Sequence, residues 1–450
     1  MTQLNALAAP TSTRYFALIA PCIAQALIAL DYAIVYIALP TLAHDLQLSL
    51  STMQWVVSLY GLTFAALLLP GGNLCDRFGA RRIFSTGMAL FLLASALGGL
   101  AHSGELLLIA RAGQGIAAAL LQPAVLALIG QRFHGESHRR ALAIWSAIGA
   151  LGLVAGVVLG GVLTTLSWRA IFFINLPPGL LALWRVKRDF QHLIPQSEAP
   201  RSGVGALVGC AAAGALVWAL MRYGETGAAD FIANRLAAAM LLLFILHERF
   251  APQPLLSRAL RNLPGLQSGW LSSACYMASV GSQFYAMTLL WQQTLQLDAI
   301  ATGLLFTPLA LLIVAGNALY TRLTARYASA KVLMAGFASA ALGLWLLAMS
   351  LETPLSPAFM LGVALSGIGH GLIYPAMFAV GLTAVPAHQQ GRASALMITS
   401  QYIAGAMMLA IISVLLGAKP DLTAWSTVFH LLCGAAVAGM VIALCAREHR

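Results

Sequence analysis

Fourteen apolar runs follow one another along this chain of 450 residues, and each is long enough to cross a lipid bilayer as a helix. A helical span needs about 20 mainly apolar residues. The chain is 60% hydrophobic and 9% charged, and short loops between the runs hold nearly all of the charges. The sequence therefore predicts an all-α membrane protein with 14 transmembrane helices. The runs lie at approximately 15–40, 52–71, 83–101, 104–131, 139–165, 169–186, 203–222, 231–248, 265–290, 299–322, 331–350, 356–380, 391–417 and 424–445.

The distribution of positive charge predicts the orientation of these spans. With the N-terminus placed inside, the cytoplasmic segments hold 20 of the 25 Lys and Arg residues and the outer loops hold four. Because positive loops stay on the cytoplasmic side, we expect a multi-pass protein of the cell inner (plasma) membrane with both termini in the cytoplasm. The first run is too long for the apolar core of a signal peptide, so we expect it to be a retained span.

Composition argues against several classes of function. The net charge of +11 is spread over many loops, so lipid headgroups are the expected partner and nucleic acid is not. The six cysteines include no close pair, so neither a disulfide framework nor a metal site is predicted. The sequence has no nucleotide-binding loop of the type GxxxxGK followed by Ser or Thr. We therefore expect no cofactor and a proton gradient as the source of energy.

An internal repeat divides the chain into two homologous halves. A shift of 249 residues pairs Gly87 with Gly336, and a shift of 252 pairs Pro123 with Pro375, each within a matching stretch. Two parallel-related halves with a site at their interface are typical of rocker-type secondary transporters. The predicted units are an N-terminal six-helix half (1–186), a cytoplasmic linker (187–202), two inserted transmembrane helices (203–262) and a C-terminal six-helix half (263–450).

Asp31 and Arg111 are the acidic and the basic residue that lie well inside predicted spans. A charge in hydrocarbon is unfavourable unless it is paired or neutralised, which makes both residues functional candidates. At 1.5 Å per residue, Asp31 lies ~14 Å and Arg111 ~9 Å from the outer end of its span, so contact is possible. An arginine beside a carboxylate favours its charged form and separation favours the protonated form, as proton coupling requires. The alternative is a purely structural ion pair that fixes the helix register.

Five stretches occur in the order of the motifs of the major facilitator superfamily, and together they resemble its 14-span drug:proton antiporter branch. In that branch the arginine of the fourth span, here Arg111, is associated with proton coupling, and the resemblance implies the same role. Ala33 and Tyr36 stand where the first motif usually has Thr and Asn, and Val157 stands where the motif of the fifth span usually has Pro. The stretches are "LDYAIVYIALPTL" (30–42), "GNLCDRFGARR" (72–82), "LIARAGQGIAAALLQPA" (108–124), "GLVAGVVLGG" (152–161) and "SWRAIFFINLPPG" (167–179).

The charged stretch between the second and third runs resembles the loop motif of this superfamily. The resemblance implies that its acid, its first arginine and its glycines clamp neighbouring helix ends in one conformation and release them in the other. The internal repeat has Arg326 at the position of Arg77 and the basic Lys331 at that of Arg82, but it has Ala325 in place of Asp76 and Ala328 in place of Gly79. The predicted residues of this conformational-switch loop are Gly72, Asp76, Arg77, Gly79, Arg81 and Arg82.

The fifth run carries glycines at four-residue spacing, which gives a helix a smooth strip that another helix can approach closely. The resemblance identifies this strip as the antiporter motif. Ordinary tight packing explains it as well as a hinge or a seal against leakage does. The glycines are Gly152, Gly156, Gly160 and Gly161.

His370 and a set of aromatic, Met and Gln residues are further candidates. A histidine can change its charge near neutral pH, so His370 is a candidate second proton site, although a lone histidine is more often a hydrogen-bonded core residue. Aromatic and Met side chains suit a lipophilic or cationic ligand, although many membrane aromatics face lipid. The candidate residues of the substrate cavity are Trp55, Tyr60, Trp145, Tyr276, Phe284, Tyr285, Gln292, Tyr374, Met377, Gln401 and Tyr402.

Together these features predict a proton-coupled secondary active transporter that exports lipophilic, cationic drugs or toxic compounds, as multidrug efflux proteins do. We expect small lipophilic or cationic substrates and membrane lipids as partners, and a monomer. Two alternatives remain open, namely a transporter of the same fold for a specific metabolite and a non-transporting membrane sensor. An intramembrane enzyme would need a constellation of His, Asp or Glu residues within the spans, which Asp31 and His370 do not supply.

Overall fold

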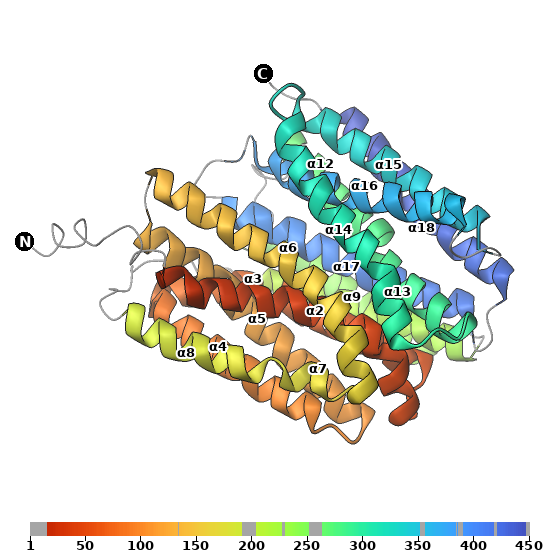
Figure 1. The fold of residues 1–450 in the computed structure, drawn as a ribbon, viewed down its shortest axis with the longest axis horizontal. Coiled ribbons are helices and arrows are strands. Elements are labelled where there is room, and N and C mark those ends of the chain that lie inside the picture. The colour runs from red at the N-terminus through yellow and green to blue at the C-terminus, as the bar shows by residue number, and fades with distance from the viewer. Residues whose placement is uncertain are drawn as a thin grey trace, which may run out of the picture.

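The computed structural model of the chain consists of helices and connecting loops throughout the residues that it describes (Figure 1). These residues are 16–133, 135–190, 204–226, 230–251, 263–351, 356–383, 385, 390–417 and 421–446. The predicted all-α membrane fold is confirmed for this part of the chain, because its long helices are apolar and pack side by side.

The N-terminal helices form one bundle, drawn from red to yellow in Figure 1. Ser49 and Ser103 begin two of them, because each hydroxyl accepts a hydrogen bond from a backbone amide three residues later. The elements are η1 (Phe16–Leu18), α2 (Ile19–Asp45), α3 (Leu50–Phe78), α4 (Ala80–Gly99), α5 (Gly104–Arg132), α6 (Gly135–Leu166), α7 (Ala170–Phe173) and α8 (Leu176–Asp189).

Two helices lie between this bundle and the C-terminal one in the order of the chain. Helix α9 (Val204–Thr226) packs against α3 and α17, one helix from each half, whereas α10 (Phe231–Phe250) packs on α9. Asp230 caps α10, and hydrogen bonds from the Ala233 amide and from Arg222 hold the pKa of this half-buried carboxyl below its usual value. Helix α9 therefore lies against both bundles, and α10 covers α9.

The C-terminal helices form a second bundle, drawn from green to blue in Figure 1. Its first four elements, α12, η2, α13 and η3, follow one another without an intervening loop, and η2 and η3 are π-helical segments. Such segments bulge a helix and are frequent at functional sites. The elements are α12 (Pro264–Tyr276), η2 (Met277–Gly281), α13 (Ser282–Leu289), η3 (Leu290–Thr294), α14 (Ala299–Leu323), α15 (Ser329–Met349), α16 (Pro357–Leu382), α17 (Gln390–Leu416) and α18 (Leu422–Cys445).

Eleven helices in the described residues are long and apolar enough to cross a membrane. Three predicted spans are not among them. The range 169–186 became the short helices α7 and α8, the range 203–222 contributes a shorter apolar stretch (Leu207–Leu220), and 265–290 contains the π-helical segments. Length and composition thus establish a multi-pass helical protein, and the count of 14 stays a prediction.

Packing between neighbouring helices repeats in the two halves. Gly87 of α4 lies so close to α5 that a Cβ added to it would be 3.2 Å from Cγ of Leu121. Gly336 of α15 has the same relation to α16, where a Cβ would be 3.0 Å from Cγ1 of Ile373. The two glycines differ by 249 positions and their two partners by 252, which are the shifts found in the sequence.

The two halves contact each other at the end of the bundle where α2 stops, which we call the Asp45 end. Gln292 of η3 donates a hydrogen bond from Nε2 to the carbonyl oxygen of Ile37 at 2.8 Å. Helices α6 and α14 lie side by side (Figure 1), and a Cβ on Gly161 would be 2.8 Å from the carbonyl oxygen of Ala299. The opposite end, where α3 turns into α4, is called the Arg81 end.

Candidate coupling site and substrate pocket

Asp31 and Arg111 form an ion pair in the interior of the N-terminal bundle. Nη1 of Arg111 lies 2.6 Å from Oδ2 of Asp31, and the two residues are 0% and 1% exposed. The pair joins α2 to α5 at the depth where the sequence places both charges. Two opposite charges so close are stabilised strongly when water is excluded, provided that their remaining polar atoms are also hydrogen-bonded.

Neutral polar residues complete the environment of the Asp31 carboxylate. Gln114, one turn along α5 from Arg111, donates from Nε2 to Oδ1 of Asp31 at 2.7 Å and to the Ser95 hydroxyl of α4 at 3.0 Å. Asn175, directly before α8, donates from Nδ2 to the same two acceptors, each at 3.2 Å. Sequence reasoning missed these three residues. The spacing of Gln114 from Arg111 places both on one face of α5, and this was the available signal.

Arg111 keeps partners that do not depend on Asp31. Its Nε donates to the carbonyl oxygen of Val56 in α3 at 3.0 Å, and Nη1 also donates to Oε1 of Gln114 at 2.7 Å. The guanidinium carbon lies 4.5 Å from the centre of the Tyr60 ring, a cation–π contact. The buried positive charge is therefore partly stabilised even when the carboxylate is neutral.

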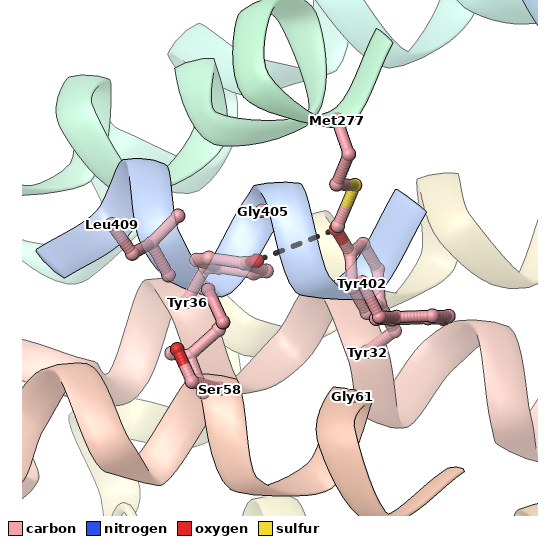
Figure 2. A pocket seen from close by; sticks show the side chains of 10 residues that line it. Tyr32, Tyr36, Ser58, Gly61, Met277, Tyr402, Gly405 and Leu409 are labelled. Carbon is pink, nitrogen blue, oxygen red and sulfur yellow. Dashed lines mark hydrogen bonds between the residues drawn. The ribbon is translucent and has the colours of Figure 1, made fainter. Parts of the chain in front are cut away.

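A small pocket lies between the two halves, close to this network (Figure 2). Its free space is about 20 Å³, which is room for about one water molecule. Figure 2 shows Met277 of η2 reaching down towards the tyrosines of α2, and Tyr402 of α17 beside them. The Tyr36 hydroxyl donates to the Tyr32 hydroxyl at 3.3 Å, and the Tyr32 hydroxyl in turn points to Sδ of Met277 at 3.8 Å. The lining residues are Tyr32, Tyr36, Val57, Ser58, Gly61, Met277, Tyr402, Gly405, Ala406 and Leu409.

Aromatic rings connect the pocket to the ion pair. The Tyr60 ring lies on Arg111 and stacks on Phe64 with centroids 6.4 Å apart. Phe64 meets Tyr402, which lines the pocket, edge to face at 5.4 Å. Packed aromatic side chains therefore lie between the pocket and the ion pair.

Comparison with known proteins identifies the family. The family model of the Major Facilitator Superfamily matches residues 22–409 and, in a second match, 269–449. The chain belongs to the major facilitator superfamily.

Relatives of this superfamily member are named for drug export and resistance. The chain is 35% identical over 421 residues to the cephamycin export protein of Amycolatopsis lactamdurans, a match over 90% of this chain and 86% of that protein. It is 34% identical over 429 residues to the puromycin resistance protein of Streptomyces alboniger, over 90% and 82% of the two chains. The predicted drug-efflux transporter is confirmed at this level, whereas the 14-span antiporter branch stays a prediction.

A solved structure shares the fold of this transporter. The crystal structure of the peptide transporter POT in complex with sulfate superposes with a TM-score of 0.73 and covers 99% of this chain and 97% of that chain. The sequence identity of 15% means that this likeness concerns the fold alone.

The glycine strip of this transporter has two packing faces. A Cβ on Gly152 or Gly156 would lie 2.9 or 2.7 Å from a backbone carbonyl oxygen of α2, belonging to Ala26 and Leu30 respectively. A Cβ on Gly160 would meet only side chains of α2, whereas Gly161 faces α14. The strip therefore holds α6 against the part of α2 that carries Asp31. Val157, at the departure from the motif, is fully buried.

The loop motif lies at the Arg81 end, between α3 and α4. Gly79 adopts φ of 87°, a conformation that favours glycine and lets the chain turn sharply from one helix into the next. Arg81 donates from Nη2 to the carbonyl oxygen of Lys187 at 3.4 Å, while Arg77 and Arg82 are exposed. A Cβ on Gly72 would meet no neighbour within 4 Å. The side chain of Asp76 lies outside the described part of the structure, so its predicted clamp stays a prediction.

His370 lies in an aromatic cluster of the C-terminal bundle. Its Nε2 is hydrogen-bonded to the hydroxyl of Tyr276, and its ring meets Phe284 edge to face with centroids 6.1 Å apart. Its described surroundings are those of a core residue, and its role as a second proton site stays a prediction.

The predicted cavity residues lie in several different places. Tyr402 lines the pocket, and Tyr60 lies behind it on Arg111. The other nine are not among its lining residues. Trp55 packs with α9 and α17, and Trp145 packs in the core of the N-terminal bundle. Tyr276, Phe284 and Tyr374 belong to the aromatic cluster around His370. Tyr285 is hydrogen-bonded to Ser413, Gln292 is hydrogen-bonded to α2, and Met377 and Gln401 are buried in the C-terminal bundle.

The prediction from the sequence did not include the pocket residues of α2 and η2. Tyr32 and Tyr36 are one helical turn apart, so they share the face of α2 that meets the other half. This spacing can be recognised in the sequence. The partner Met277 is 245 positions away from Tyr32, so only the fold shows that the two side chains meet.

Proposed function

We propose that this transporter is a proton-coupled multidrug exporter of the 14-span antiporter branch, which moves lipophilic cations out of the cell. The observation that carries the proposal is the Asp31–Arg111 ion pair, fully buried and joining two helices beside the interface pocket. An acid inside a membrane protein marks a proton or ion pathway by default. Relatives named for export of and resistance to antibiotics support the direction of transport.

In the proposed cycle a proton neutralises Asp31 and releases its hold on Arg111. Arg111 then keeps Val56 and Gln114 as acceptors, while Gln114 keeps the Ser95 hydroxyl. Oδ1 of Asn175 is buried without a hydrogen-bond partner among the described residues. Rotation of this amide would turn its oxygen towards the new O–H of Asp31, so the protonated state has a ready acceptor. Loss of the charge attraction loosens α2 from α5 and allows the halves to rock.

We further propose the topology of this cycle. Both termini face the cytoplasm, the Arg81 end lies inside and the Asp45 end outside, as the excess of cytoplasmic Lys and Arg indicates. The cross-half contacts of Gln292 and Gly161 at the Asp45 end then close the outer side. The predicted division into 1–186, 187–202, 203–262 and 263–450 and a monomeric state belong to the same proposal. Single cysteines at each end, labelled from outside with an impermeant reagent, test the topology.

Flux in proteoliposomes with an imposed pH gradient tests the function. The purified protein should concentrate tetraphenylphosphonium against its gradient when the proton gradient runs the opposite way, and should stop when an ionophore collapses that gradient. A panel of neutral metabolites serves as comparison. Flux of one metabolite without flux of any lipophilic cation would support the specific-metabolite alternative, and absence of all flux would support a sensor.

The loop motif gives a prediction of its own. Asp76→Asn should slow transport of tetraphenylphosphonium by about tenfold, because a conformational step commonly limits the turnover of such proteins, while the Kd for this cation should stay within about twofold. Turnover in proteoliposomes and equilibrium binding are the two measurements. Asp189→Asn is the control, since this acid at the same end pairs with Arg185 within α8. A rise in Kd that matches the loss of rate would place Asp76 in binding and contradict the proposed switch.

A further inference from the structure

Two glycines of the pocket each stand directly behind one of its larger side chains. A Cβ on Gly405 of α17 would be 2.6 Å from Cγ of Met277. A Cβ on Gly61 of α3 would overlap the ring of Tyr402. Since heavy atoms do not approach so closely without a shift, both side chains owe their present positions to the missing methyl groups. Figure 2 shows both glycines at the pocket, with Met277 and Tyr402 beside them.

These two side chains come from the C-terminal half and close on the tyrosines of the N-terminal half. Met277 belongs to the π-helical segment η2 and receives the Tyr32 hydroxyl at its sulfur. Gly281, at the end of the same segment, also leaves room for the Met277 thioether. Met is unbranched and readily changes its rotamer, and the two glycines let its side chain lie back against the helices where a methyl group would hold it in the pocket.

The volume and chemistry of the pocket indicate what enters it. Its free space of about 20 Å³ is far below the about 300 to 1,000 Å³ of typical small-molecule sites, so every ligand of that class requires wall residues to move, and a larger ligand requires a larger movement. The lining holds three tyrosines, a thioether and a hydroxyl but no Asp, Glu, Lys or Arg. Such a surface suits an aromatic, lipophilic cation with delocalised charge, which gains cation–π contacts without requiring a fixed counter-charge.

We propose that Gly405 and Gly61 set the size of the substrates that this transporter accepts, by leaving room for Met277 and Tyr402 to withdraw from the pocket. This inference rests on the proposed export of lipophilic cations and names the residues that select among them. An added methyl group at either position pushes the wall side chain into the pocket and removes the space into which it withdraws. The pocket then opens less far, which excludes large cations before small ones.

Equilibrium binding of two phosphonium cations of different size tests the inference. The full-length protein in lipid nanodiscs is titrated with tetraphenylphosphonium and with the smaller methyltriphenylphosphonium. Gly405→Ala should weaken tetraphenylphosphonium by about tenfold, the size of a moderate overpacking effect, and methyltriphenylphosphonium by less than about threefold. Gly61→Ala should act in the same direction. Retained binding of the smaller cation shows that each variant is folded.

A compensating variant and a matched glycine make the test specific. In Gly405→Ala combined with Met277→Ala the displaced side chain is absent, so tetraphenylphosphonium binding should recover to within about threefold of the wild type. Gly434→Ala introduces the same methyl group into α18, where it meets no neighbour within 4 Å, and should leave both affinities unchanged.

The outcomes separate this inference from the function on which it rests. Equal weakening of both cations in Gly405→Ala, or failure of Met277→Ala to restore the larger one, overturns the role of the glycines while export remains. If the wild type binds and transports neither cation, the proposed function fails and the substrate inference fails with it.

Discussion

Asp31→Asn should uncouple export from the proton gradient. Without an ionisable group at this position, gradient-driven flux of tetraphenylphosphonium should fall by about tenfold or more, within the usual range of coupling free energies, to the level measured without a gradient. Binding of the cation should persist, because Asp31 does not line the pocket. The measurement is flux into proteoliposomes at several imposed pH differences, together with the Kd of the same preparation.

Matched controls decide whether the loss of gradient-driven flux is specific to Asp31 or follows from the removal of any ion-paired carboxylate. Asp45→Asn removes a carboxylate from the same helix, an exposed one that pairs with Arg169, and should leave coupling intact. His370→Gln should do the same if Asp31 is the coupling residue. Gradient-driven flux that survives Asp31→Asn unchanged would disprove the assignment.

A double variant separates coupling from stability. Asp31→Asn alone leaves the buried Arg111 charge without its carboxylate, and breaking a buried pair destabilises a protein by about 3 kcal/mol or more. Replacing both charges, as Asp31→Asn with Arg111→Gln, should recover much of the thermal stability but none of the coupling. Recovery of coupled flux in the double variant would mean that the pair is only structural.

The sequence predicted the ion pair because two charges in apolar spans have few ways to be stable. The network of Gln114, Ser95 and Asn175 could not be predicted in the same way. Neutral polar residues are common in spans, and which of them meet depends on how α4, α5 and α8 pack. The aromatic candidates show the same limit. Tyr276 satisfies its hydroxyl on His370 within one half, whereas Tyr32 reaches across to the other half.

The charged residues Asp31 and Arg111 of the N-terminal half have no charged counterparts at the repeat positions of the C-terminal half. The repeat places Val280 and Val363 at the positions of Asp31 and Arg111, and Ser366 at that of Gln114. Ser366 accepts a hydrogen bond from Nε2 of Gln283 at 2.9 Å, so the C-terminal bundle has a neutral pair in this region. The proton that we propose to bind Asp31 would therefore act on a charged pair that has no counterpart at the matching positions of the C-terminal half.

Gly156→Ala should weaken both the stability of the protein and its coupled transport. Its Cβ would lie 2.7 Å from the carbonyl oxygen of Leu30, a backbone atom that cannot turn away as a side chain can. Helix α2 must shift directly beside Asp31, and overpacking of this kind destabilises proteins by about 1 to 3 kcal/mol. We expect a lower unfolding temperature and, because the Asp31–Arg111 distance changes, a loss of gradient-driven flux larger than the loss of binding.

Gly160→Ala is the matched control for this prediction, one turn along the same strip. Its Cβ would be 3.0 Å from Cβ of Ile37, a milder approach than that of Gly156, which a shift of a few tenths of an ångström relieves. Its unfolding temperature and coupled flux should therefore lie close to those of the wild type. Equal effects of the two substitutions would show that general crowding of the glycine strip, and not the contact with the α2 backbone next to Asp31, limits transport.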